Sequence, residues 1–413
     1  MSKKIDERLP GHIGEGMLPG YAAIKTPWEK LIGYRDAMHY AARYRAVISA
    51  AIMQALRIVL PDYAERAKLM CEDAYARLLA MTEQGVDSFI NNQNMHPFFR
   101  GNFPGALIGD KGDDAQLMCG RVNDFGTYRA EKELDVCDWD VVGSELCRAT
   151  TMSLQGNADG VAKALRPGPR LEFHMVEAKG CGDRHCRIVA ECREKYPMPP
   201  HEIWEAFGPV GSADQIKFTP EEECVRESDI FREETNYAFI NGTNAENNAS
   251  SAVLIAYASA ATLYILPTAR YAIGKGLVEE KFFDHVLRCV CEAAGKTAFG
   301  EAYTKEALRQ WLNVPRDIGD DDGRVMGAHI EMYLQSVRVP YEIEAFNKDE
   351  VVYVIDRNVL TVGELKFADA LVAYWYGMTK TLVNPQWSLW EEAGDIPADK
   401  LRIKIAKKID KFC

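Results

Sequence analysis

The chain has 413 residues, of which 47% are hydrophobic and 27% charged, values that are ordinary for a globular protein and exclude disorder over most of its length. Its formal net charge of −12 disfavours nucleic acid as a partner, because phosphate binding needs a basic face. The length predicts two to four domains, or one large domain with an internal repeat.

The N-terminal region, residues 1–27, is rich in glycine and proline and is predicted to form an extended arm. It contains no apolar segment of the kind that secretory signals carry, so we expect a cytoplasmic protein. The most apolar stretch, residues 249–265, is short for a membrane span and rich in Ala and Ser, which favours a buried helix and no membrane partner. The odd number of cysteines, eleven, predicts reduced thiols rather than a disulfide framework.

The first domain is expected to cover residues 28–195, with helices packed on an antiparallel sheet. Apolar residues three and four positions apart predict one helix that ends at Pro61 and a second over residues 62–81. A long loop follows, and the chain then continues with a strand, a helix and two alternating runs that read as a β-hairpin, over residues 133–138, 142–165, 171–178 and 186–192.

The same order of elements returns after a proline-rich connection, residues 196–247, and predicts a second, degenerate copy over residues 248–413. Residues 134–165 align with residues 352–383 without a gap. The alternative is two unrelated domains of similar make-up. The predicted fold class is therefore α+β, with two related domains, each with helices on an antiparallel sheet, in a pseudo-twofold internal duplication.

A group of cysteines distinguishes the first copy from the second, in which the aligned positions carry no thiol. Its main members are Cys137, Cys147, Cys181 and Cys186. Thiolates are soft metal ligands and strong nucleophiles, so this segment is the first candidate for chemistry. The alternative is that these cysteines are small hydrophobic side chains in a core.

Several polar side chains near the cysteines are candidates for moving protons, namely Asp138, Asp183 and His185. An imidazolium stabilises a thiolate, so Cys186 or Cys181 near His185 is a candidate activated nucleophile. The alternative is that His185 and Cys186 lie on a strand, where neighbouring residues point to opposite faces and do not pair. Trp139 lies between two aspartates at the predicted strand end and is a candidate for substrate binding.

The long loop carries a second group of candidate substrate-binding residues, His96, Phe98 and Arg100. Aromatic side chains could close this loop over an organic substrate, and Arg100 could hold a carboxylate by two hydrogen bonds. The alternative is a loop packed by its own aromatic side chains. The acidic sequence at residues 319–323 lacks the ligand pattern of a calcium loop and is interpreted as a solvated turn.

The order of features in residues 130–195 resembles the L-2-amino-thiazoline-4-carboxylate hydrolase-like family and the related 4-vinyl reductase family domain, with an echo in residues 350–410. The features are a cysteine before a helix, the sequence ELC within it, a break containing Pro-Gly, and a GDxxC turn into the last strand. The matching residues are Cys137, Gly143, Glu145, Leu146, Cys147, Pro167, Gly168, Glu172, Phe173, Gly182, Asp183 and Cys186.

This resemblance implies an α+β domain with a pocket for a small organic molecule between its helices and a curved sheet. In the hydrolase-like members it implies opening of a small ring that contains a C–N bond, with Cys186 or Cys137 as nucleophile or metal ligand. In the 4-vinyl reductase group it implies a ligand sensor, and sensor relatives carry zinc. Such a divalent metal would be bound here by Cys147, Cys181 and Glu177, although Lys179 stands where the family pattern has a cysteine.

The expected function is a hydrolase-like enzyme that acts on a small organic molecule, and a homo-oligomer is an expected assembly. The alternative is a non-catalytic protein that binds a small aromatic ligand as a sensor or accessory factor.

Overall fold

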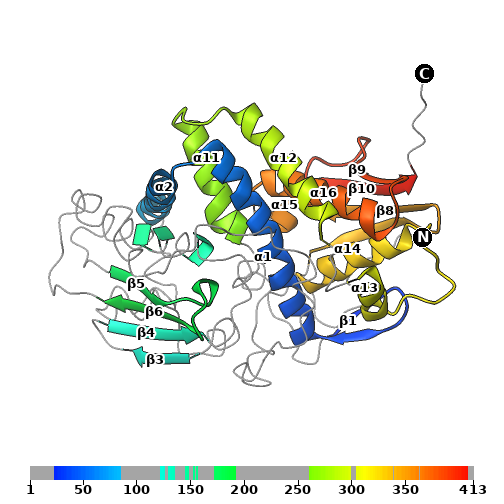
Figure 1. Ribbon diagram of the computed structural model, residues 1–413. Helices are drawn as coiled ribbons and strands as arrows, with labels where there is room; N and C mark the ends of the chain where they lie inside the picture. Colours follow the sequence, from blue (N-terminus) through cyan, green and yellow to red (C-terminus); the bar gives the residue numbers. More distant parts are fainter. Residues whose placement is uncertain are drawn as a thin grey trace.

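The architecture is a mixture of helices and antiparallel sheets, which confirms the predicted α+β class at that level. Figure 1 shows the protein as a computed structural model. It describes residues 23–84, 121–125, 129–134, 145–147, 152–153, 155–156, 172–191, 260–298, 304–337, 339–361 and 363–407. The start of the predicted arm, the proline-rich connection and the loop with His96, Phe98 and Arg100 lie outside the described residues.

The predicted elements that lie within the described residues follow the predicted order, and the strands β1, β2, β3 and β7 are additional to them. The helices are α1 (Tyr34–Val59), α2 (Tyr63–Gln84), α11 (Leu266–Gly274), α12 (Glu280–Lys296), α13 (Lys305–Leu312), α14 (Arg324–Ser336), α15 (Arg357–Thr361) and α16 (Lys366–Leu382), with a short 3-10 helix η4 (Lys179–Cys181) and a short π-helix η8 (Ala261–Ile265). The strands are β1 (Ala23–Lys25), β2 (Leu31–Gly33), β3 (Arg121–Phe125), β4 (Arg129–Leu134), β5 (Glu172–Glu177), β6 (Cys186–Glu191), β7 (Tyr341–Phe346), β8 (Glu350–Asp356), β9 (Trp387–Glu391) and β10 (Lys400–Lys407).

Most element ends are where local signals predict them. Helix α1 ends just before Pro61, and Asp62 Oδ1 accepts a hydrogen bond from Glu65 N at the start of α2. Both predicted hairpins are present as the antiparallel pairs β5–β6 and β9–β10. One strand is displaced, because β4 ends at Leu134, near the start of the strand predicted at residues 133–138. Its ladder with β6 determines that position.

Two four-stranded antiparallel sheets have the orders β3-β4-β6-β5 and β7-β8-β10-β9. In each, the first two strands are neighbours and the fourth lies between the second and the third. Each first strand also contains a register shift, between Val122 and Asp124 in β3 and between Ile343 and Ala345 in β7. A β-bulge of this kind leaves one residue without a partner across the ladder and changes which face the later side chains occupy.

The core is built around α14, which is buried from Val325 to Ser336. Helix α1 crosses the middle of the molecule in Figure 1 and packs against α12 and α14. A buried polar contact joins α1 to α14, in which Arg45 Nε donates to Tyr333 Oη over 2.5 Å. Trp375 Nε1 of α16 donates to Tyr44 Oη over 2.6 Å. Helix α1, which was predicted within the first domain, therefore packs into the core formed by the second half.

The N-terminal hairpin is attached to the same helix by a buried amide. Gln335 accepts a hydrogen bond from Lys25 N and donates one to Lys25 O, each over 3.0 Å. Gln335 also donates to Glu331, whose carboxylate accepts from Tyr341 Oη over 2.7 Å. Buried polar groups are stable when they are hydrogen-bonded in this way, so α14 combines a wholly buried position with polar side chains.

No single helix among the described residues has both the length and the apolar composition of a membrane span. Residues 44–59 of α1 and 63–77 of α2 together pass that test on length and composition, although the chain bends by 115° between them.

Acid should destabilise the protein through His329. Burial lowers the pKa of this imidazole from 6.5 to about 3, because the charged form is poorly solvated inside the protein. Below pH 6.5 the unfolded chain binds a proton that the folded chain does not bind until about pH 3. The contribution to stability is complete above pH 6.5 and falls as pH decreases, by about 1.4 kcal/mol per unit inside that window.

We expect a His329→Gln variant to lose stability less steeply than the parent protein between pH 6.5 and pH 4, measured by urea unfolding at each pH. Asp73, Glu364 and Asp369, whose pKa values burial raises, titrate in both proteins and cancel in the difference. Equal slopes for the two proteins would contradict the assignment.

Candidate functional site

The hairpin β5–β6 carries the cysteines through a tight turn. Gly182 has a φ of 89°, a left-handed conformation that favours glycine. The Asp183 side chain closes the turn, because its Oδ2 accepts a hydrogen bond from Ala178 N over 3.0 Å. Asp183, predicted to handle protons, is thus held by the backbone of the turn.

Three thiols meet beside this turn. Cys147, from the helical segment 145–147, and Cys186, at the start of β6, are both buried in one small cluster, and the half-buried Cys181 packs against it. Met175 and Ala178 complete the cluster. The N–H of Lys179 donates to Cys186 Sγ over 3.3 Å, which directs the positive end of a backbone dipole at the sulfur.

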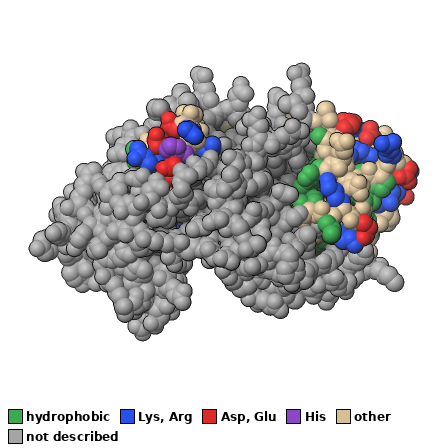
Figure 2. All heavy atoms as spheres, turned by 90° about the horizontal axis from the view of Figure 1, so that it is seen from below, with side chains coloured by type: hydrophobic (Ala, Val, Ile, Leu, Met, Phe, Trp, Pro, Cys, Tyr) green, Lys and Arg blue, Asp and Glu red, His purple; other side chains and the backbone are tan. Residues whose placement is uncertain are grey.

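His185 lies away from the thiol, on the other face of the sheet. Its Nε2 is 2.8 Å from Glu177 Oε2, and its Nδ1 is 4.0 Å from Glu133 Oε1. Arg187 Nε donates to the same Glu177 oxygen over 3.0 Å. Figure 2 shows a surface patch in which histidine lies among acidic and basic side chains. The imidazole is thus directed at Glu177 and not at Cys186, as the alternation of side chains along a strand would have it.

The predicted metal ligands are divided between these two faces. Met175 is buried opposite Ile188, but a register shift after it places Glu177 opposite Arg187, on the outer face. Simple alternation would have put Glu177 and Met175 on one side, so the bulge separates Glu177 from the thiols. Within the described residues, no group of three or more His, Cys, Asp or Glu side chains is arranged to hold a metal ion.

Glu145 is the residue that sequence reasoning underestimated. It is only 4% exposed, and its two oxygens accept from Arg57 Nε over 2.5 Å and from Arg66 Nε over 2.8 Å. These bonds hold the segment that carries Cys147 against the ends of α1 and α2. The available signal was a single charged residue in the stretch 141–147, two positions before a cysteine.

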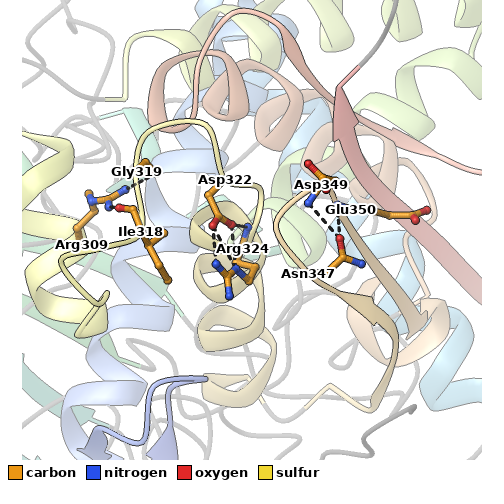
Figure 3. A network of polar contacts seen from close by, with 8 residues as sticks. All are labelled: Arg309, Ile318, Gly319, Asp322, Arg324, Asn347, Asp349 and Glu350. Atoms are coloured by element: carbon orange, nitrogen blue, oxygen red, sulfur yellow. Dashed lines mark hydrogen bonds and ion pairs between the residues drawn. The ribbon is translucent and has the colours of Figure 1, made fainter.

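The acidic loop at residues 319–323 is held by protein groups (Figure 3). Arg324 bonds to both oxygens of Asp322, and Arg309 donates to the backbone carbonyls of Ile318 and Gly319. The turn is therefore not wholly solvated, because Asp322 is buried beneath its arginine.

The preceding residue of this loop, Asp321, also has hydrogen-bond partners. Lys407, Trp387 and Asn384 all donate to Asp321. The bond from Lys407 is the largest cause that lowers the pKa of Asp321 to about 2.

The remaining predicted site residues, Cys137, Asp138 and Trp139, lie outside the described residues, as do the three loop residues named above. Comparison with family models, with curated proteins and with solved structures finds no match to this chain.

Proposed function

We propose that this protein is a hydrolase-like enzyme for a small organic molecule, with the thiol of Cys186 as its reactive group. The observation that supports this proposal best is the meeting of Cys147, Cys181 and Cys186, from two separate segments, in one cluster. Soft, nucleophilic groups gathered in this way suit attack on an electrophilic carbon. The described residues offer no group of three ligands for the divalent metal that the resemblance implies, so the proposed chemistry uses the thiol alone.

The chemistry would follow the family that the segment resembles. The Cys186 sulfur would form a bond to the carbon of a ring amidine, and the ring C–N bond would break as the nitrogen takes up a proton. Water would then release the product and restore the thiol. Cys186 is 2% exposed and Cys181 is half-buried, so the substrate would approach from the side of Cys181.

A second candidate is a protein that binds the same class of molecule without turnover. The observation that favours it is the position of His185, which contacts Glu177 and Glu133 on the face away from the thiols. A thiol nucleophile usually needs a neighbouring base, and this imidazole is directed elsewhere.

The proposal includes an internal duplication, in which the first half carries the chemistry. The identical strand orders and the bulge in each first strand support it. When the two bulges are aligned, Leu134 of β4 corresponds to Ile355 of β8 and Cys186 to Leu401. This ladder alignment differs by three positions from the gapless one, which paired Cys137 with Ile355, but it keeps the thiol opposite a leucine.

Helix packing supports the same duplication. A Cβ on Gly156 would lie 2.1 Å from the carbonyl oxygen of Cys71 in α2, and a Cβ on Gly377 of α16 would lie 2.1 Å from that of Glu292 in α12. In each half, a glycine of the later helix thus meets a backbone carbonyl of the earlier one. A buried glutamate also contacts an arginine in both halves, as Glu145 with Arg57 and Glu364 with Arg270.

The test compares Cys186→Ser with Cys291→Ser, a control at a cysteine buried in the main core. The probe is 2-amino-thiazoline-4-carboxylate, and turnover and melting temperature are measured on each protein. We expect Cys186→Ser to abolish turnover, because serine is a far weaker nucleophile at neutral pH. Its melting temperature should fall about as much as that of the control, because Cys186 is buried too.

Cys291→Ser should keep its rate per folded molecule while losing about 1–3 kcal/mol of stability, because it buries a hydroxyl. An unchanged specific rate in Cys186→Ser would reject the catalytic role. Binding of the probe by calorimetry, without turnover in the parent protein, would favour the second candidate.

A further inference from the structure

Helix α12 presents a cysteine and a histidine together on its exposed face. His285 and Cys289 are four residues apart, so they lie one above the other on the helix surface. Both are exposed, and Cys289 Sγ is 3.7 Å from His285 Nε2. The opposite face of α12, with Phe283, Leu287 and Cys291, is buried in the core. The pair is therefore held on a helix whose position is determined by packing.

The separation of the two atoms fits a shared metal ion. Zinc binds cysteine sulfur at about 2.3 Å and histidine nitrogen at about 2.0–2.1 Å, and a tetrahedral ion that joins both would set them about 3.5 Å apart. The distance in the protein is 3.7 Å. An ion would thus replace the contact between sulfur and nitrogen with little movement of either side chain.

We propose that His285 and Cys289 form a two-ligand site for a divalent cation of the zinc class. Imidazole and thiolate are the ligands that zinc prefers among protein side chains. The nearby carboxylates have partners of their own, because Lys296 bonds to Glu292, and Lys366 bonds to Glu280 and Asp284. Water completes the coordination, so the site is open and exchangeable, unlike a closed structural site with four protein ligands.

This site shares no residue with the thiol cluster of the first half, and its test does not depend on any activity. The reduced, chelator-treated full chain is alkylated with iodoacetamide in the presence and absence of Zn²⁺, and each cysteine is followed by mass spectrometry. We expect Zn²⁺ to slow the alkylation of Cys289. Cys291, two residues further along and buried, is an internal control for opening of the helix.

The matched variant is His285→Gln, which removes one ligand at an exposed position and leaves the thiol in place. We expect it to lose the protection by Zn²⁺, whereas Cys181→Ser, at the other thiol site, should retain it. The absence of protection in the parent protein, or equal protection in His285→Gln, would overturn the proposal. The second of these results would mean that the thiol binds zinc without the imidazole.

Discussion

Replacing Glu145 with Gln should lower the free energy of unfolding by about 3–5 kcal/mol, because it removes the charge that two largely buried arginines share. The Glu145 side chain is 5% exposed, and those of Arg66 and Arg57 are 6% and 19% exposed. Glutamine keeps nearly the same size, so the effect reports on charge more than on packing. Urea unfolding of the variant and the parent protein measures the difference.

The control is Glu344→Gln on the outer side of β7. Glu344 also accepts two hydrogen bonds from one arginine, Arg402, over 2.8 and 3.0 Å, but its side chain is 39% exposed, against 5% for Glu145. Solvent weakens such a pair, so we expect a loss of only about 0.2–1 kcal/mol. If Glu145→Gln were no more destabilising than this control, the buried position of the first pair would have no energetic importance.

Replacing Gly377 with Ala should lower the free energy of unfolding by about 3 kcal/mol, at the upper end of typical overpacking effects. The added Cβ would lie 2.1 Å from the carbonyl oxygen of Glu292, and a Cβ on Gly295 would similarly lie 2.0 Å from that of Tyr374. The obstacle is backbone on both sides, which cannot rotate away as a flexible side chain does. Helices α12 and α16 would have to separate, so the melting temperature should fall.

Gly274→Ala, at the end of α11, is the matched control. Nothing lies within 4 Å of a Cβ at that position, so we expect a change of less than about 1 kcal/mol, in the stabilising direction. The close contact at Gly156 predicts that Gly156→Ala is destabilising as well. A tolerated alanine at Gly377 would show that α12 and α16 do not require this close approach.

Local patterns were sufficient to locate helices α1, α2 and α16 and the hairpins β5–β6 and β9–β10, but not the strands β3 and β7. The proline at position 61 ends α1, because helical geometry is sterically unfavourable for the residue that precedes a proline. Alternating apolar residues located β5, β6, β9 and β10 to within a few positions. These signals act between residues close in sequence, so they can be recognised without knowing the rest of the fold.

The positions of Glu177 and of α1 could not be predicted in the same way. A bulge after Met175 turns Glu177 to the face of His185, and only the ladder between β5 and β6 reveals it. Helix α1 has an apolar face that would fit either half, and its packing on α12 and α14 is a choice among partners far along the chain.

The sequence by itself determined the α+β class, the helix and hairpin elements and the concentration of thiols before and within one hairpin. Tertiary structure alone decided which of those residues meet: Cys147 with Cys186, Glu145 with Arg57 and Arg66, and His185 with Glu177. The physical reason is the distance along the chain over which each kind of interaction acts. Periodicity and turn preference act over a few residues, whereas contacts between distant segments depend on strand register and helix packing across the whole chain.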